Sequence, residues 1–369
     1  MTHESLLNEL WTSTLTRLGG AASIDAAAFE TRAFLRPRGI KSATDLLRII
    51  LAYCLGGMGL RSTSAWAASV GLADVSNVAL LGRLRKSTAW MEHLVGVMLA
   101  RGVSEATHGR RVRLLDATTV PKASLKARHN GGTWRIHAAF DLPSERFSFF
   151  ELTDEKGAEK FDRVPVEAGE IRIGDRGYCH VERLAAICAA QADFVVRAGW
   201  RMVRWLDEDG ATFDLSAALT EAEAAGRIDQ KIWLWRCKRA PLAVRLVAFR
   251  KPPAAIETSR RKARREAAKE GFTPNDQTLM AAEWVLLVTS LPASQFSADD
   301  IGKLYRARWR IEMAFKRLKS LVGLSGPPGE DPNVAKTWIL AHLLIILLLE
   351  PHTAVVEDSP RSGQAILAA

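Results

Sequence analysis

The first hundred residues carry apolar side chains at the spacing of helices. Between residues 42 and 55, apolar positions recur every three or four residues, directly after Ser42 and near Asp45. Serine and aspartate are residue types that begin helices, because their side chains accept hydrogen bonds from the first free backbone N–H groups. We therefore expect residues 1–108 to form an all-helical N-terminal domain.

Two short helical patterns lie within residues 62–87, on either side of Gly71. The second pattern ends in three cations, Arg83, Arg85 and Lys86. A short helix, a turn and a basic second helix resemble a helix-turn-helix that contacts DNA. Plain packing of a two-helix hairpin gives the same pattern, so both interpretations stay open.

The pattern changes at residue 110 to one typical of β-strands, rich in β-branched and aromatic residues. We expect strands at 110–120, 134–142 and 146–154, and a short strand that starts at 170 and ends at Gly174-Asp175. A helix at 180–192 and a strand at 193–199 should follow. Three consecutive strands followed by strand, helix and strand predict a mixed sheet with helices on its faces. The fold class is therefore α/β.

Residues 199–283 interrupt this order. Their pattern predicts antiparallel strands within 200–215 and 231–251 and then a highly charged helical stretch at 259–270. A strand pattern returns at 282–292, so we interpret 199–283 as a β-rich insertion.

A long helix is expected after Ser297, reaching residue 322. Proline and glycine at 325–332 then break the chain before a last apolar segment. The apolar run from Trp338 to Leu349 is short for a membrane span, so residues 325–369 are expected to form a buried C-terminal helix and a tail.

Composition limits the class of protein. Of the 369 residues, 48% are apolar and 25% are charged, as in soluble globular proteins. The four cysteines and eight histidines form no spacing typical of zinc sites, which favours reduced thiols and a cytoplasmic protein. A net charge of +10 with 11 tryptophans favours a polyanionic partner, nucleic acid above all.

One basic stretch, YRARWRIEMAFKRLK at 305–319, contains a single carboxylate, Glu312. On one continuous helix, Tyr305, Arg308, Glu312 and Lys319 would share a stripe beside the apolar face. Ion pairs between Glu312 and cations four residues away are the ordinary explanation for such a residue. They leave the surplus of cations unexplained, because these repel one another unless an external anion binds.

Two further carboxylates stand where strands are expected. Asp116 lies late in one strand and Asp175 ends another, although aspartate is unfavourable in strands and is commoner in strand-end turns. If both meet Glu312, three hard oxygen ligands would suit Mg²⁺. Two such ions about 3.5–4 Å apart stabilise the attacking and leaving oxygens of a phosphoryl displacement. The neighbouring cations would then hold a DNA backbone.

These residues resemble a known family. The spacing Y-x2-R-x3-E-x6-K is met by Tyr305, Arg308, Glu312 and Lys319. LLDATTV around Asp116 and IGDRGY around Asp175 are similar to the first and second acidic blocks of the same proteins. These are the DDE transposases of the insertion-sequence-four (IS4) type.

The resemblance implies a fold and a metal site. The fold is a ribonuclease-H-like core, here 109–198 and 284–324, interrupted by the β-rich insertion and preceded by the helical domain. The catalytic residues and metal ligands are Asp116, Asp175 and Glu312. They would hold two Mg²⁺ (or Mn²⁺) ions in each active site.

The resemblance also implies DNA contacts. Phosphates at the transposon end would be held by Tyr305, Arg308 and Lys319. A flipped base would stack on Trp284, and further phosphate contacts would come from Arg176 and Arg197.

The implied activity is metal-dependent cleavage at transposon ends and transfer of the 3′-hydroxyl into target DNA. The partners are double-stranded DNA (terminal inverted repeats and target) and a second copy of the chain in a synaptic homodimer, in the bacterial cytoplasm at the nucleoid and with no membrane. Two alternatives stay open: a catalytically inactive DNA-binding regulator derived from a transposase, and a ribonuclease-H-like nuclease without strand transfer.

Overall fold

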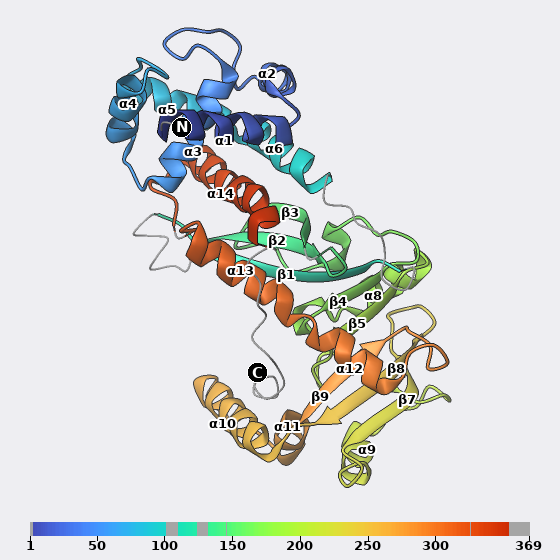
Figure 1. Cartoon of the computed structure of the whole chain (residues 1–369). Helices are drawn as coiled ribbons and strands as arrows, with labels where there is room; N and C mark the ends of the chain where they lie inside the picture. Colours follow the sequence, from blue (N-terminus) through green and yellow to red (C-terminus); the bar gives the residue numbers. More distant parts are fainter. Residues whose placement is uncertain (1–2, 101–109, 124–131, 145, 325, 354–369) are drawn as a thin grey trace.

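The computed structural model describes residues 3–100, 110–123, 132–144, 146–324 and 326–353 (Figure 1). The end of the expected helical domain, 101–108, and the expected tail beyond 353 lie outside these ranges. The α-helices are α1 (His3–Arg17), α2 (Ala21–Glu30), α3 (Ala43–Leu55), α4 (Leu60–Ser69), α5 (Asn77–Lys86), α6 (Thr88–Ala100), α8 (Val181–Ala189), α9 (Leu215–Glu221), α10 (Pro253–Lys269), α11 (Asp276–Ala282), α12 (Ala298–Arg306), α13 (Trp309–Leu321) and α14 (Pro332–Thr353). Two short 3-10 helices are η1 (Phe161–Arg163) and η2 (Arg176–Tyr178).

The strands form one mixed sheet in the order β3-β2-β1-β4-β5-β9-β8-β7-β6. Their bounds are β1 (Val112–Pro121), β2 (Thr133–Asp141), β3 (Arg146–Asp154), β4 (Ile171–Gly174), β5 (Asp193–Arg197), β6 (Trp205–Leu206), β7 (Arg227–Leu234), β8 (Leu242–Arg250) and β9 (Trp284–Thr289). β4 runs parallel to both β1 and β5, and the other pairs are antiparallel. The expected α/β class is therefore confirmed.

Helices cover both faces of this sheet. Because successive side chains of a strand point to opposite faces, Leu114 and Ile173 pack in one apolar core and Leu115 packs in the other. The first core also contains α12, α13, α14 and the N-terminal helices, whereas the second contains α8, α9 and α11. Figure 1 shows α13 crossing the sheet over β1. The face that carries Ile173 is thus the face toward α12 and α13.

The strands of the segment 199–283 extend the main sheet. The expected antiparallel hairpin is present as β7 and β8, and β8 pairs along its length with β9. The strand expected near Trp205 has only two residues, because the turn-forming Asp207 to Gly210 end it and α9 follows soon after. The charged stretch at 259–270 lies on α10, as expected.

The single helix expected over 297–322 is wrong, because the chain forms two helices there. α12 begins at Ser297, whose side chain accepts a hydrogen bond from the backbone N–H of Asp300. Between α12 and α13 the backbone N–H groups of Arg308, Arg310 and Ile311 bond three residues back instead of four. Such tight turns rotate α13 relative to α12, so one helical stripe does not run through both.

The C-terminal helix is longer than the apolar run predicts, and it packs with the N-terminal helices. α14 packs against α3, α5 and α6 (Figure 1). Within the described part of the chain, α14 is also the helix with the length and composition of a membrane span, over Pro332–Leu349. Since 72% of that window is buried inside the protein, we interpret α14 as a core helix.

Buried charges fix β4 beside β1. Arg172 of β4 is fully buried and donates to Glu170, with 2.6 Å between Nε and Oε1. Its Nη1 donates to the carbonyls of Phe161 and Val164, at 2.6 and 2.8 Å, and its Nη2 donates to the carbonyl of Pro165. Arg113 of β1 reaches the same Glu170 carboxylate at 3.3 Å. This network ties the loop before β4 to the start of the parallel pair.

Candidate active site

The register of β1 and β4 places Asp116 and Asp175 side by side. Leu114 pairs with Ile173 and Leu115 with Gly174. Asp116 and Asp175 are the next residues on these parallel strands. Each stands two positions beyond a side chain that faces α12 and α13, so both aspartates turn to that face.

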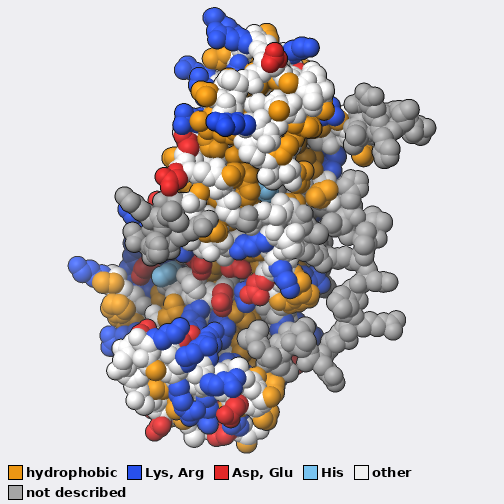
Figure 2. All heavy atoms as spheres, turned by 90° about the vertical axis from the view of Figure 1, so that its left-hand side faces the viewer, with side chains coloured by type: hydrophobic (Ala, Val, Ile, Leu, Met, Phe, Trp, Pro, Cys, Tyr) orange, Lys and Arg blue, Asp and Glu red, His pale blue; other side chains and the backbone are white. Residues whose placement is uncertain are grey.

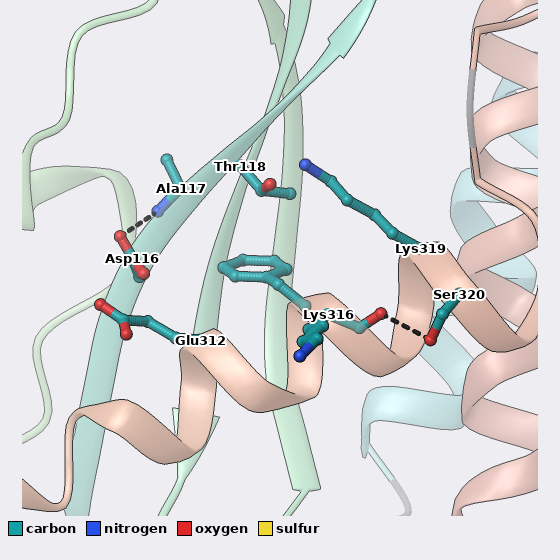
Figure 3. A pocket seen from close by; sticks show the side chains of 8 residues that line it. Asp116, Ala117, Thr118, Glu312, Lys316, Lys319 and Ser320 are labelled. Carbon is teal, nitrogen blue, oxygen red and sulfur yellow. Dashed lines mark hydrogen bonds between the residues drawn. The ribbon is translucent and has the colours of Figure 1, made fainter. Parts of the chain in front are cut away.

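Glu312 approaches the same point from the first turn of α13. Its Oε1 accepts from Nη1 of Arg308 at 2.6 Å, and the same nitrogen lies 4.0 Å from Oδ2 of Asp116. Figure 3 shows the carboxylates of Asp116 and Glu312 close to one another. One guanidinium therefore joins a strand carboxylate to a helix carboxylate.

Tyr305 supplies the link to Asp175. Its hydroxyl donates to Oδ1 of Asp175 at 2.9 Å. The guanidinium carbon of Arg308 lies 5.6 Å from the centre of the Tyr305 ring. Tyr305 at the end of α12 and Arg308 just after it thus connect all three predicted carboxylates.

The pKa values of the two aspartates are shifted in opposite directions. The pKa of Asp116 is raised to about 6, chiefly by burial and also by Glu159 and Glu312, although the Ala117 backbone N–H and Arg308 lower it. Burial also raises the pKa of Asp175, but Arg308, the backbone N–H of Arg176 and the Tyr305 hydroxyl outweigh it and lower the pKa overall. Asp175 is therefore the better-compensated anion of the pair.

A fourth carboxylate, Glu159, belongs to this neighbourhood and was not predicted. It lies in the loop after β3, and its Oε2 occupies the space where a side chain on Gly177 would have to go. Burial and then Asp175 raise the pKa of Glu159, while Arg135 lowers it. No spacing rule connects a loop glutamate to two strand aspartates, so the sequence carried no signal for it.

Lys319 lines a hollow that opens beside Asp116 and Glu312. The hollow has a volume of about 500 Å³ and is also lined by Thr118, Phe315 and Lys316. In Figure 3, Lys316 and Lys319 lie on the α13 side of the carboxylates, farther along the helix. The predicted carboxylates Asp116 and Glu312 and the predicted DNA-binding residue Lys319 thus line the same surface hollow.

A second cavity, of about 660 Å³, begins at Asp175 and runs toward α10. The other predicted DNA-binding residues, Arg176, Arg197 and Trp284, all line it. Trp284 is the first residue of β9 and is only 3% exposed. Stacking of a base on its ring would therefore need neighbouring side chains to move.

The predicted helix-turn-helix forms as two helices, α4 and α5, and two of its three cations contact the chain itself. Arg83 donates to the carbonyls of Ala33 and Arg36, and Arg85 pairs with Asp331 at 2.6 Å. Lys86 is exposed. Packing within the helical unit thus occupies most of the basic end of α5.

The donor set suits a hard divalent cation, although its present arrangement holds Arg308 instead. Within the described residues, no three acidic, histidine or cysteine side chains lie close enough to hold a metal ion. The buried Nε of Arg308 has no hydrogen-bond partner among these residues. Arg308 is a partly buried cation between carboxylates with an unbonded Nε, and it stands where divalent charge would compensate the carboxylates better.

Replacing Asp116 by asparagine should stabilise the metal-free protein at neutral pH. The pKa of Asp116 is raised from 3.8 to about 6 in the folded protein. Ionisation of Asp116 therefore destabilises the folded state fully above pH 6. This destabilisation decreases as the pH falls and is absent below about pH 3.8. We expect Asp116→Asn to raise the free energy of unfolding by about 1–3 kcal/mol at pH 7.5 and to change it little at pH 3.5.

Urea unfolding at both pH values measures this difference. Asp209→Asn, at an exposed turn, is the control and should have little effect at either pH. A gain for Asp116→Asn that is the same at pH 3.5 and 7.5 would contradict the explanation.

Comparisons with known proteins show the family to which the chain is similar. The family model described as "Transposase DDE domain" matches residues 107–348. The chain is 37% identical to the putative transposase InsL of insertion sequence element IS186A from Escherichia coli K12, over 92% of this chain and 93% of that protein. It is also 37% identical to the transposase of insertion sequence element IS421 from Escherichia coli, with the same coverage of both proteins. It is 24% identical to the putative transposase y4zB of Sinorhizobium fredii over 64% of this chain and 60% of that protein.

Proposed function

Because the chain belongs to the DDE transposases of insertion sequences and is a DNA transposase, we propose that Asp116, Asp175 and Glu312 form its catalytic centre. The proposed core is ribonuclease-H-like, built from 109–198 and 284–324, with 199–283 inserted and the N-terminal helices preceding it. The proposed cofactor is a pair of Mg²⁺ or Mn²⁺ ions held by the three carboxylates.

One observation carries this proposal. Strand register alone puts Asp116 beside Asp175, and the Tyr305–Arg308 turn brings Glu312 to the same face. These three acids are far apart in the sequence, occur in the motifs that resemble the family, and lie on the same face of the sheet. A chance set of surface acids would not combine these properties. Bound ions would supply charge neutralisation at the scissile phosphate and an ionised water or 3′-hydroxyl as nucleophile.

The protein's own residues prepare the site for this chemistry. Arg308 offsets part of the negative charge of Asp116 and Glu312, which limits repulsion among the acids. When DNA and divalent ions bind, Arg308 would turn from the carboxylates to a backbone phosphate, and Lys319 would join it from the same face. Tyr305 would keep Asp175 oriented through its hydroxyl.

Further parts of the proposal concern assembly. The substrates would be the terminal inverted repeats and a target duplex, with Trp284, Arg176 and Arg197 around the DNA end at the second cavity. Two copies of the chain would hold two ends together, in the cytoplasm at the nucleoid. The α4–α5 pair would contribute DNA contacts through its exposed surface.

Cleavage and joining assays test this function. A duplex carrying the end of the element, taken from the DNA that flanks the gene, should be cut in the presence of Mg²⁺ and joined to a target plasmid. Binding without cleavage would instead indicate a regulator. Cleavage without joining of pre-cut ends would indicate a nuclease.

Replacing Arg308 should weaken DNA binding and alter its salt dependence. For Arg308→Ala we expect the slope of log K against log salt to fall by about one, as for the loss of one phosphate contact. Fluorescence anisotropy on the element-end duplex between 50 and 200 mM salt, the range in which such slopes are usually read, measures it. The control is Arg239→Ala, at the exposed β7–β8 turn, which should keep the parent slope. An unchanged slope for Arg308→Ala would remove this residue from the phosphate contacts.

A further inference from the structure

The helix α10 carries a row of cations that the chain itself does not use. Arg261, Arg265 and Lys269 recur every four residues, and Lys262 precedes Lys269 by seven, so the four share one side of the helix. All four side chains are exposed, and none forms an ion pair with a residue that the structure describes. Like charges at this spacing weaken a helix, so the arrangement is unfavourable for folding alone. We call these four residues the α10 ridge.

The α10 ridge continues into the cavity that begins at Asp175. Lys262 belongs to the ridge and also lines the cavity, together with Arg176, Arg197 and Lys251. Lys251 is held there by the Ser259 hydroxyl and the Ala282 carbonyl, at 2.7 and 2.9 Å. The cavity also has two acids on its α10 wall, Glu266 and Glu270.

The charge balance in this cavity is positive despite those acids. The pKa of Lys251 is lowered to about 8, chiefly by burial and also by Arg197, Arg176 and Lys262. Figure 2 shows acidic side chains across the middle of one face and many Lys and Arg side chains on the lobe below them, where Figure 1 places α10. Positive charge thus extends from Asp175 outward along α10.

Two depressions leave the carboxylates in different directions and share no lining residue. One contains Asp116 and Glu312 and follows α13 past Lys316 and Lys319, and the other contains Asp175 and leads to α10. A DNA strand whose scissile phosphate lies at the three carboxylates must leave on both sides. If the transposon end lies along α13 and its terminal base enters the second cavity, the DNA beyond the cut continues past that cavity along α10.

We propose that the α10 ridge binds the phosphodiester backbone of the flanking DNA, on the side of the scissile phosphate opposite to α13. This rests on the proposed function of Asp116, Asp175 and Glu312. Its chemistry is that of exposed, unpaired cations releasing counterions from a duplex, so it adds affinity without reading sequence.

The test compares two duplexes with one triple variant. Arg261→Gln/Arg265→Gln/Lys269→Gln removes three ridge charges and keeps good helix formers, and it spares the cavity residue Lys262. The duplexes are the element end with about 20 base pairs of flank, or two helical turns, and the same end already cut. The control, Lys231→Gln/Lys238→Gln/Arg239→Gln, removes three exposed charges from the β7–β8 hairpin.

The ridge variant should bind the flanked duplex on the order of tenfold more weakly at 0.1 M salt, with a salt slope smaller by about 2–3. It should bind the pre-cut end as the parent does, and the control should match the parent on both. Equal weakening on both duplexes, or no difference from the control, would overturn the proposal for α10. A parent protein that does not cut the flanked duplex with Mg²⁺ or Mn²⁺ would instead contradict the catalytic assignment, whatever the ridge variant does.

Discussion

Glu312→Gln should abolish DNA cleavage while leaving DNA binding intact. Glutamine keeps the size of the side chain and the helix, but it is a weaker ligand for a divalent cation and carries no charge. Loss of one carboxylate from a two-ion site removes several kcal/mol of transition-state stabilisation, so we expect the cleavage rate to fall at least about 10³-fold. Removing a negative charge next to a phosphate leaves affinity equal or higher.

Single-turnover cleavage of the element-end duplex measures this effect, with anisotropy measuring binding in parallel. Glu221→Gln, an exposed carboxylate on α9, is the matched control and should cut at the parent rate. Because Glu312 pairs with Arg308, circular dichroism of the variant should confirm an intact fold. Cleavage by Glu312→Gln at the parent rate would remove Glu312 from the catalytic centre.

Arg172→Met should cause the largest loss of stability among single changes outside the site. The substitution leaves Glu170 buried at 1% exposure without its closest partner, and three carbonyls lose their donor. Breaking a buried pair by removing one member costs about 3–5 kcal/mol, and we expect the free energy of unfolding to fall by that amount in urea titrations.

Two controls isolate the buried charge as the cause. The double variant Glu170→Met/Arg172→Met removes both charges and should recover part of the loss, because apolar replacement of a whole buried pair is tolerated better. Arg85→Met breaks an exposed pair with Asp331 and should change stability little. If Arg172→Met is as stable as the parent, the network does not hold β4 in place.

The sequence was informative about the residues of the site and poorly informative about how they meet. Asp116 and Asp175 stood out because aspartate is rare in strands, and Glu312 because it was alone among cations. Their neighbourhood depends on strand register, which is set by pairing between segments some sixty positions apart and leaves no local trace in composition.

The break between α12 and α13 shows why the sequence predicted the residues of the helical stripe but not the two helices that carry them. No proline or glycine marks residues 307–308, so periodicity predicts an unbroken helix. The observed tight turn instead places Arg308 where it reaches Glu312 and Asp116 together.

Loop conformation set the other limit. Glu159 reaches the site from a loop that follows β3, and Lys251 and α10 reach the second cavity because β8 joins the main sheet beside β9. The sequence separated residues 199–283 as an insertion with its own strands. It could not reveal that those strands would extend the same sheet and bring α10 close to Asp175.

The location of bound metal tests the central claim most directly. Anomalous scattering from Mn²⁺ in crystals of the protein with an element-end duplex would place the ions without assumptions. We expect two peaks about 3.5–4 Å apart, with oxygens of Asp116, Asp175 and Glu312 among their ligands and Arg308 turned to a phosphate. Mn²⁺ bound elsewhere, with Arg308 still paired to Glu312 beside the scissile phosphate, would contradict the account.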